Sequence, residues 1–100
     1  MEAKEEIILN KIIYTINSTL SPKRIYLFGS RGKGNAKYNS DYDIAIDGKK
    51  PSSKILLQIE EEIEEILGLH KFDLVFLENV DKELIKIIKK SGKIIYERRN

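Results

Sequence analysis

Apolar residues recur every three or four positions in three stretches of the chain, a spacing that predicts amphipathic helices. These stretches are residues 3–19, 52–67 and 81–91. Ser52 or Ser53 is expected to cap the second helix and Asp81 the third, because a side-chain oxygen at this position accepts a hydrogen bond from the first turn. Gly68 follows the second helix, where glycine commonly ends a helix. The sequence therefore predicts three helices, each with one apolar face.

Four short and mostly apolar runs between these helices predict strands. They are residues 24–28, 41–47, 72–77 and 93–97. Acidic and apolar residues alternate in the second run, which predicts a strand with one acidic and one buried face. A polar loop over residues 30–40 separates the first two strands, and we expect a helical turn at residues 35–38.

The order of these elements predicts the topology of the sheet. A helix joins strands 41–47 and 72–77, and such a connection is normally a right-handed crossover between adjacent parallel strands. We expect strand 24–28 to be the antiparallel neighbour of strand 41–47. The chain is therefore predicted to form one α/β (α+β) domain over residues 1–100. Its mixed sheet of about four strands would carry three helices packed mainly on one face.

Composition excludes several classes of protein. Hydrophobic residues make up 41% and charged residues 34% of the chain, which is typical of a globular protein, and the net charge of +2 does not favour nucleic-acid binding. There is no cysteine, and the one histidine, His70, is expected in a surface turn, so thiolate and multi-histidine metal sites are excluded. No apolar run is long enough to cross a membrane and the N-terminus lacks a secretion signal, so we expect a cytoplasmic protein.

Three aspartates are candidates for metal binding and catalysis. Asp41 and Asp43 lie two residues apart on one strand, so their side chains share a side and repel each other unless a cation lies between them. Asp73 is expected beside them on the neighbouring strand, in an apolar run where a carboxylate is costly unless paired or metal-bound. Carboxylate oxygens suit Mg²⁺, and two such ions can support in-line nucleotidyl transfer. The alternative is a solvated strand edge.

The loop before these aspartates has features of a phosphate-binding turn. Gly29 and Ser30 follow the first strand and offer backbone N–H groups and a hydroxyl to anionic oxygens. Lys33 lies between two glycines, where the backbone can approach a ligand closely, and Ser40 completes the candidate nucleotide-binding set. The basic residues that could neutralise a triphosphate are Arg31, Lys33 and Lys37. The alternative is an ordinary turn with solvated charges.

The stretch 29–43 contains Gly-Ser, ten further residues and then Asp-x-Asp. It resembles the GSx10DxD motif of minimal nucleotidyltransferases, which belong to the superfamily related to DNA polymerase beta. The resemblance covers essentially the whole chain, including Asp73 and the closing segment SGKIIYE. The chain departs from the family at residues 32–34, where Gly-Lys-Gly replaces the common Ala-Arg-Gly, and lysine lacks the bidentate fork of arginine.

The resemblance implies a nucleotidyltransferase fold and roles for the candidate residues. Asp41, Asp43 and Asp73 would be the catalytic carboxylates and would bind Mg²⁺, with two ions expected. Gly29 and Ser30 would hold the phosphates of ATP, the expected substrate. Proteins of this size resemble antitoxins that transfer AMP from ATP to a tyrosine of a HEPN-domain toxin, so a HEPN toxin is the expected partner. The chain is expected to form a homo-oligomer or a hetero-oligomer.

Other functions remain open from the sequence. The chain could neutralise a toxin by binding alone, without catalysis. It could also modify a small molecule, although such enzymes usually carry an additional substrate domain for which 100 residues leave little room. Nucleic-acid binding is the least favoured, because the charges are nearly balanced and no platform of aromatic and basic residues is present.

Overall fold

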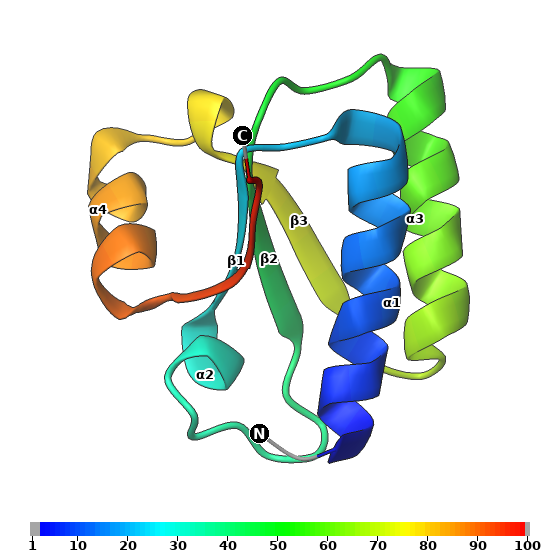
Figure 1. Cartoon of the computed structure of the whole chain (residues 1–100). Coiled ribbons are helices and arrows are strands. Elements are labelled where there is room, and N and C mark those ends of the chain that lie inside the picture. Colours follow the sequence, from blue (N-terminus) through cyan, green and yellow to red (C-terminus); the bar gives the residue numbers. More distant parts are fainter. Residues whose placement is uncertain (1–2, 100) are drawn as a thin grey trace.

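The chain folds into a four-stranded sheet with helices on both faces, as Figure 1 shows. The computed structural model describes residues 3–99. Its helices are α1 (Ala3–Leu20), α2 (Gly29–Gly32), α3 (Ser53–Leu67) and α4 (Lys82–Ser91), with a 3-10 turn η1 (Leu77–Asn79). Its strands are β1 (Arg24–Phe28), β2 (Tyr42–Asp47), β3 (Phe72–Phe76) and β4 (Lys93–Glu97). The predicted α+β class is confirmed, and none of the helices within residues 3–99 is long and apolar enough to cross a membrane.

The register of the sheet brings three chain segments to one end of the molecule. The strands lie in the order β3-β2-β1-β4. β1 and β2 are antiparallel, with Phe28 opposite Asp43, and β2 and β3 are parallel, with Asp43 opposite Asp73. β4 pairs antiparallel with the other side of β1. The predicted crossover and antiparallel pair are confirmed, and the end of β1 lies beside the starts of β2 and β3.

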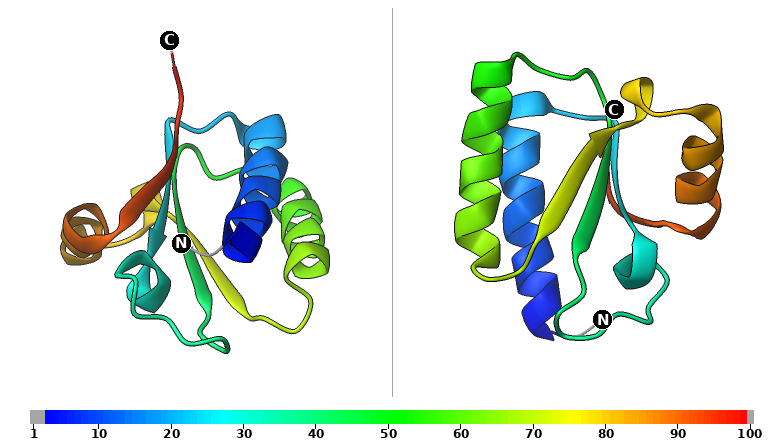
Figure 2. Two further views of the ribbon diagram at one scale, coloured as in Figure 1. Left: turned by 60° about the horizontal axis from the view of Figure 1, so that its bottom comes forward. Right: turned by 180° about the vertical axis from the view of Figure 1, so that it is seen from behind.

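The helices divide between the two faces of the sheet, as Figure 2 shows. α1 and α3 lie side by side on one face and bury the larger apolar cluster, to which Ile16 of α1, Ile63 of α3 and Ile44 of β2 belong. α4 lies on the opposite face, where Ile88 belongs to a smaller cluster with Tyr26. Two of the three predicted helices therefore share a face, and α4 does not.

The position of α4 makes both faces of β2 apolar in the middle of the strand. Ala45 is fully buried in the cluster that contains Ile88 of α4. The predicted acidic face of this strand is therefore interrupted at Ala45, which is buried. Asp43 and Asp47, which share that face, are half-buried at the two ends of the strand, where α4 does not cover them completely.

A single turn of helix, α2, lies directly after β1. Gly29 opens this turn with φ of +68°, a conformation that glycine adopts without the steric cost of a side chain. The carbonyl of Gly29 accepts a hydrogen bond from the N–H of Lys33 at 3.1 Å. The expected helical turn at residues 35–38 is wrong, because that segment is irregular and is held by a side chain of α2 that is described below.

The predicted helix ends are confirmed for α3 and α4. Ser52 accepts a hydrogen bond from the N–H of Ile55 at 3.4 Å, and Asp81 accepts one from the N–H of Leu84 at 2.8 Å. Gly68 ends α3 with a positive φ of 62°. Gly68 therefore begins the α3–β3 turn (residues 68–71), and this turn contributes to the surface beside Asp41.

Two isoleucines of α1 test which face of the helix stabilises the fold. Ile16 is completely buried, whereas Ile7 is 57% exposed. Ile16→Ala removes packed atoms and leaves a cavity, so we expect the free energy of unfolding to fall by about 2–5 kcal/mol. Ile7→Ala, the matched control, should change it by about 0.5 kcal/mol or less. Urea unfolding followed by circular dichroism measures both, and equal losses would contradict the packing of α1.

Candidate active site

Gly29 brings the backbone of α2 against the side chain of Asp43. Because Phe28 is paired with Asp43 across the sheet, Gly29 follows at the same level of the strands. A Cβ atom on Gly29 would overlap Oδ2 of Asp43, so a larger residue here would displace this carboxylate and would also be strained at the positive φ. Ser30, the next residue, is half-buried in the same turn. The two ends of the stretch 29–43 therefore meet, as the predicted topology requires.

Asp43 lies between the other two candidate carboxylates and the end of β1. Asp73 is its partner in the register of β2 and β3, and Asp41 precedes β2 by one residue. Burial raises the pKa of the Asp43 carboxyl above its usual value, and the negative charges of Asp73 and Asp41 raise this pKa further. The charges of Asp73 and Asp41 thus oppose the ionised form of Asp43, and a cation would relieve this repulsion.

Asp73 does not carry the burial cost that its apolar neighbours imply. β3 is an edge strand of the sheet, and Asp73 is exposed on it. The expectation that this carboxylate must be paired or metal-bound to be tolerated is therefore wrong. Its exposure leaves the side chain accessible to a substrate.

The donor set of these residues fits Mg²⁺ in its chemistry. Aspartate oxygens are hard ligands, and mutual repulsion among the three carboxylates favours a bound cation. Their present side-chain arrangement is open: among residues 3–99, no three His, Cys, Asp or Glu side chains are grouped closely enough to hold a metal ion. Binding an ion through several of them would therefore require side-chain rotation toward a common point.

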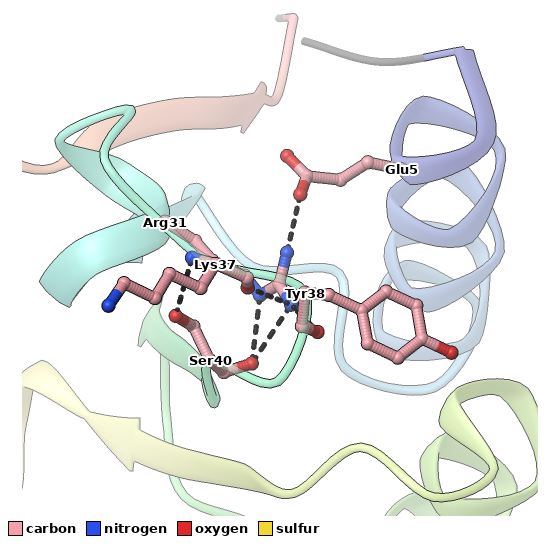
Figure 3. A network of polar contacts seen from close by, with 5 residues as sticks. All are labelled: Glu5, Arg31, Lys37, Tyr38 and Ser40. Atoms are coloured by element: carbon pink, nitrogen blue, oxygen red, sulfur yellow. Dashed lines mark hydrogen bonds and ion pairs between the residues drawn. The ribbon is translucent and has the colours of Figure 1, made fainter.

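Arg31 shapes the loop between α2 and β2, as Figure 3 shows. Its side chain is only 6% exposed, and Nη1 donates to Oε2 of Glu5 in α1 at 2.6 Å. Nε and Nη2 donate to the carbonyl of Ser40 at 3.1 and 2.9 Å. Nη2 also donates to the carbonyls of Tyr38 at 3.1 Å and Lys37 at 3.4 Å. The guanidinium therefore ties the start of α1 to the last residues before Asp41.

This network corrects one of the hypotheses for phosphate binding. Arg31 is occupied by Glu5 and by loop carbonyls, so it is not available to neutralise a triphosphate. Lys33 is exposed after α2 and remains a candidate. Ser40 is half-buried, and its Oγ accepts a hydrogen bond from the N–H of Lys37 at 2.9 Å. The nucleotide-binding roles of Lys33 and Ser40 stay predictions.

Three rings continue the network of Arg31 toward the α3–β3 turn. The Arg31 guanidinium carbon lies 3.9 Å from the centroid of the Tyr42 ring, a cation–π contact. His70 lies edge-on to Tyr42 and to Tyr38, with centroids 5.6 and 5.1 Å apart. His70 lies in the turn between α3 and β3, as expected, and is half-buried there against these rings. No periodicity or motif in the sequence links Arg31, Tyr42, His70 and Tyr38. The contacts among these four side chains were therefore not predicted.

Comparison with known proteins identifies relatives over most of the chain. Residues 10–100 match the family described as polymerase beta, nucleotidyltransferase. The protein adenylyltransferase MntA of Thermococcus cleftensis is 36% identical over 67 residues, which cover 66% of this chain and 67% of that protein. The protein adenylyltransferase MntA of Aphanizomenon flos-aquae is 31% identical over 85 residues, covering 75% of this chain and 57% of that protein. The match to the second relative thus spans little more than half of its length.

A solved structure shares the fold over nearly the whole chain. It is the crystal structure of a toxin–antitoxin with AMP-PNP, and it is 25% identical to this chain with a TM-score of 0.71. The alignment covers 98% of this chain and 76% of the other chain. The arrangement of strands and helices described above is therefore also present in a protein crystallised with an ATP analogue.

Removing the charge of Asp43 should stabilise the metal-free protein at neutral pH. The pKa of Asp43 is higher in the folded than in the unfolded state, so folding favours the protonated form, and this contribution is lost as pH rises through the raised pKa. Asp43→Asn should therefore melt at a higher temperature than the parent at pH 7 in EDTA. The difference should shrink as pH falls toward about 4, where aspartates protonate. Thermal unfolding at several pH values tests this, and a parent that melts higher at pH 7 would contradict it.

Replacing Arg31 tests the buried network. Arg31→Lys keeps the charge but cannot reach Glu5 and three loop carbonyls together, so we expect a loss of about 2–4 kcal/mol in unfolding free energy. Amides of residues 33–40 should also exchange hydrogen faster. Arg24→Lys is the matched control, because Arg24 pairs with Glu97 at the surface, and it should change little. Unchanged exchange in the Arg31 variant would contradict the role of this side chain.

Proposed function

This chain belongs to the polymerase beta nucleotidyltransferase family, and we propose that it is an antitoxin that transfers AMP from ATP to a tyrosine of a HEPN-domain toxin. The observation that carries the proposal is the contact of Gly29 with Asp43, together with the alignment of Asp43 and Asp73 across the sheet. Nucleotidyl transfer needs phosphate-binding groups beside carboxylates, and this contact supports the proposal because it puts the turn that begins at Gly29 beside the Asp43 carboxylate. The names of the two relatives support transfer of AMP, and the structure with AMP-PNP supports ATP as the donor.

The proposed reaction is an in-line displacement at the α-phosphorus of ATP. The acceptor oxygen forms a bond to this phosphorus, the bond from phosphorus to the bridging oxygen breaks, and pyrophosphate leaves. Asp73, exposed at the start of β3, accepts the proton of the acceptor hydroxyl. The N–H groups and hydroxyl of Gly29 and Ser30 orient the phosphates. Asp41 and Asp43, with Asp73 as a third ligand, would hold Mg²⁺, which supplies positive charge to the phosphate oxygens.

Neutralisation by binding alone is the second candidate function. Several large apolar side chains are exposed, among them Ile7 and Tyr14 on α1 and Leu69 in the α3–β3 turn. Exposed apolar groups of this size favour a protein partner. In this alternative the toxin is held at such surfaces and the carboxylates are not required.

Transfer of a label from ATP separates the two candidates. The purified chain, a HEPN-domain toxin encoded next to it, Mg²⁺ and ATP labelled in the α-phosphate should give a labelled toxin. Asp41→Asn or Asp43→Asn should lower the initial rate by about 100-fold or more, because each removes a charged group at the reacting phosphate. EDTA should stop the reaction.

Asp47→Asn is the matched control for these variants. Asp47 lies at the far end of β2 on the same face as Asp43, so the same chemical change is made away from the candidate site. This variant should label the toxin at the parental rate. Full labelling by the Asp43 variant would contradict the site, and protection of cells by that variant would favour neutralisation by binding alone.

A further inference from the structure

A groove opens beside Asp41, and we propose that it binds the segment of the acceptor protein that carries the AMP-accepting hydroxyl. The inference rests on the proposed function, because it assigns the surface that recognises the acceptor. The groove has a volume of about 610 Å³. It is lined by the start of α1, by residues 38, 39 and 41 at the end of the loop, and by the end of α3 with the turn that follows it. Figure 1 shows these three segments at the lower end of the molecule.

Two large side chains around this groove, Leu69 and Tyr38, are not part of the core of the fold. Leu69 lines it and is fully exposed in the α3–β3 turn, where turns usually carry small or polar residues. Tyr38 also lines the groove and is 81% exposed. Ile8 of α1 adds a half-buried apolar side chain. Large apolar groups kept in solvent around one depression are typical of a surface that a partner covers.

The position of Asp41 indicates which partner covers the groove. Asp41 lines the groove, so a molecule lying there is beside the candidate metal-binding carboxylates. Gly29 and Ser30, the proposed phosphate-binding residues, do not line it. The groove and the proposed phosphate-binding turn therefore adjoin the candidate carboxylates at different residues, and of the three carboxylates only Asp41 lines the groove. An in-line displacement needs separate places for the attacking and the leaving group, because their oxygens lie on opposite sides of the phosphorus.

The walls of the groove specify the chemistry of the acceptor segment. The rings of Tyr38 and His70 form one wall in edge-to-face contact, which suits an aromatic or aliphatic side chain next to the acceptor hydroxyl. Lys4 and Lys71 line the groove together with Asp41 and Glu65, so basic and acidic side chains are balanced there and give the acceptor segment no preferred charge.

Two leucines of equal size provide a matched test. Leu57 on α3 is 56% exposed and does not line the groove, so Leu57→Ala and Leu69→Ala remove the same atoms from different surfaces. In the labelling reaction, Leu69→Ala should raise the KM for the toxin about tenfold, as expected for a buried interface anchor. The kcat and the Kd for AMP-PNP should stay at the parental values. Leu57→Ala should change none of these quantities. Both variants should have the melting temperature of the parent.

Each other result would overturn the inference in a distinct way. A parental KM in Leu69→Ala, while Asp43→Asn abolishes labelling, would leave the proposed function intact and exclude the groove as the acceptor site. Weaker AMP-PNP binding in Leu69→Ala would assign the groove to the nucleotide. An equal rise of KM in both leucine variants would exclude a specific role for this groove. A parent chain that labels no toxin would refute the proposed function, and the inference with it.

Discussion

The buried guanidinium of Arg31 is the constraint on which the geometry of the candidate site depends. A cation this deeply buried is costly unless it is paired and hydrogen-bonded. Its partners come from different elements: Glu5 from α1, Tyr42 from β2 and carbonyls from the loop. The charge is therefore satisfied only when all three elements hold their native arrangement. Because the carbonyl of Ser40 is among the acceptors, the same hydrogen bonds fix the residue that precedes Asp41.

The charge of Asp43, unlike that of Arg31, is not compensated by a partner of opposite charge within residues 3–99. Whereas Arg31 is fully paired inside the protein, the charge of Asp43 is opposed by burial and by two neighbouring carboxylates, which raise its pKa. Natural proteins keep such unfavourable charge mainly where a ligand relieves it. The close approach of Gly29 to Asp43 adds to this picture, since it leaves no room for a side chain between the backbone and the carboxylate. In the proposed function, a bound cation would relieve this repulsion.

Local pattern and topology were sufficient to predict most of the fold and the meeting point of the candidate carboxylates. Helical periodicity located α1, α3 and α4, and the crossover through α3 predicted that Asp43 and Asp73 lie side by side. The side of the sheet on which α4 packs was not predictable. It depends on Ala45, which packs in one cluster with Ile88 of α4 although aspartates lie on either side of it on the same face of β2. The network of Arg31 was also missed, since its contacts join distant residues whose types alone imply only exposed charge. The functional roles of the site residues stay predictions.

Recognition and site geometry make opposite demands on stability in this domain. The contacts that shape the loop are buried, so changing Arg31 disturbs the fold as well as the position of Asp41. The apolar groups around the groove beside Asp41 are exposed, so Leu69 can change at little cost to folding. A domain built in this way can alter its acceptor protein by substitutions in the α3–β3 turn while the carboxylates keep their register. Specificity for a partner is then separable from the chemistry, because the two depend on residues with different roles in the folded state.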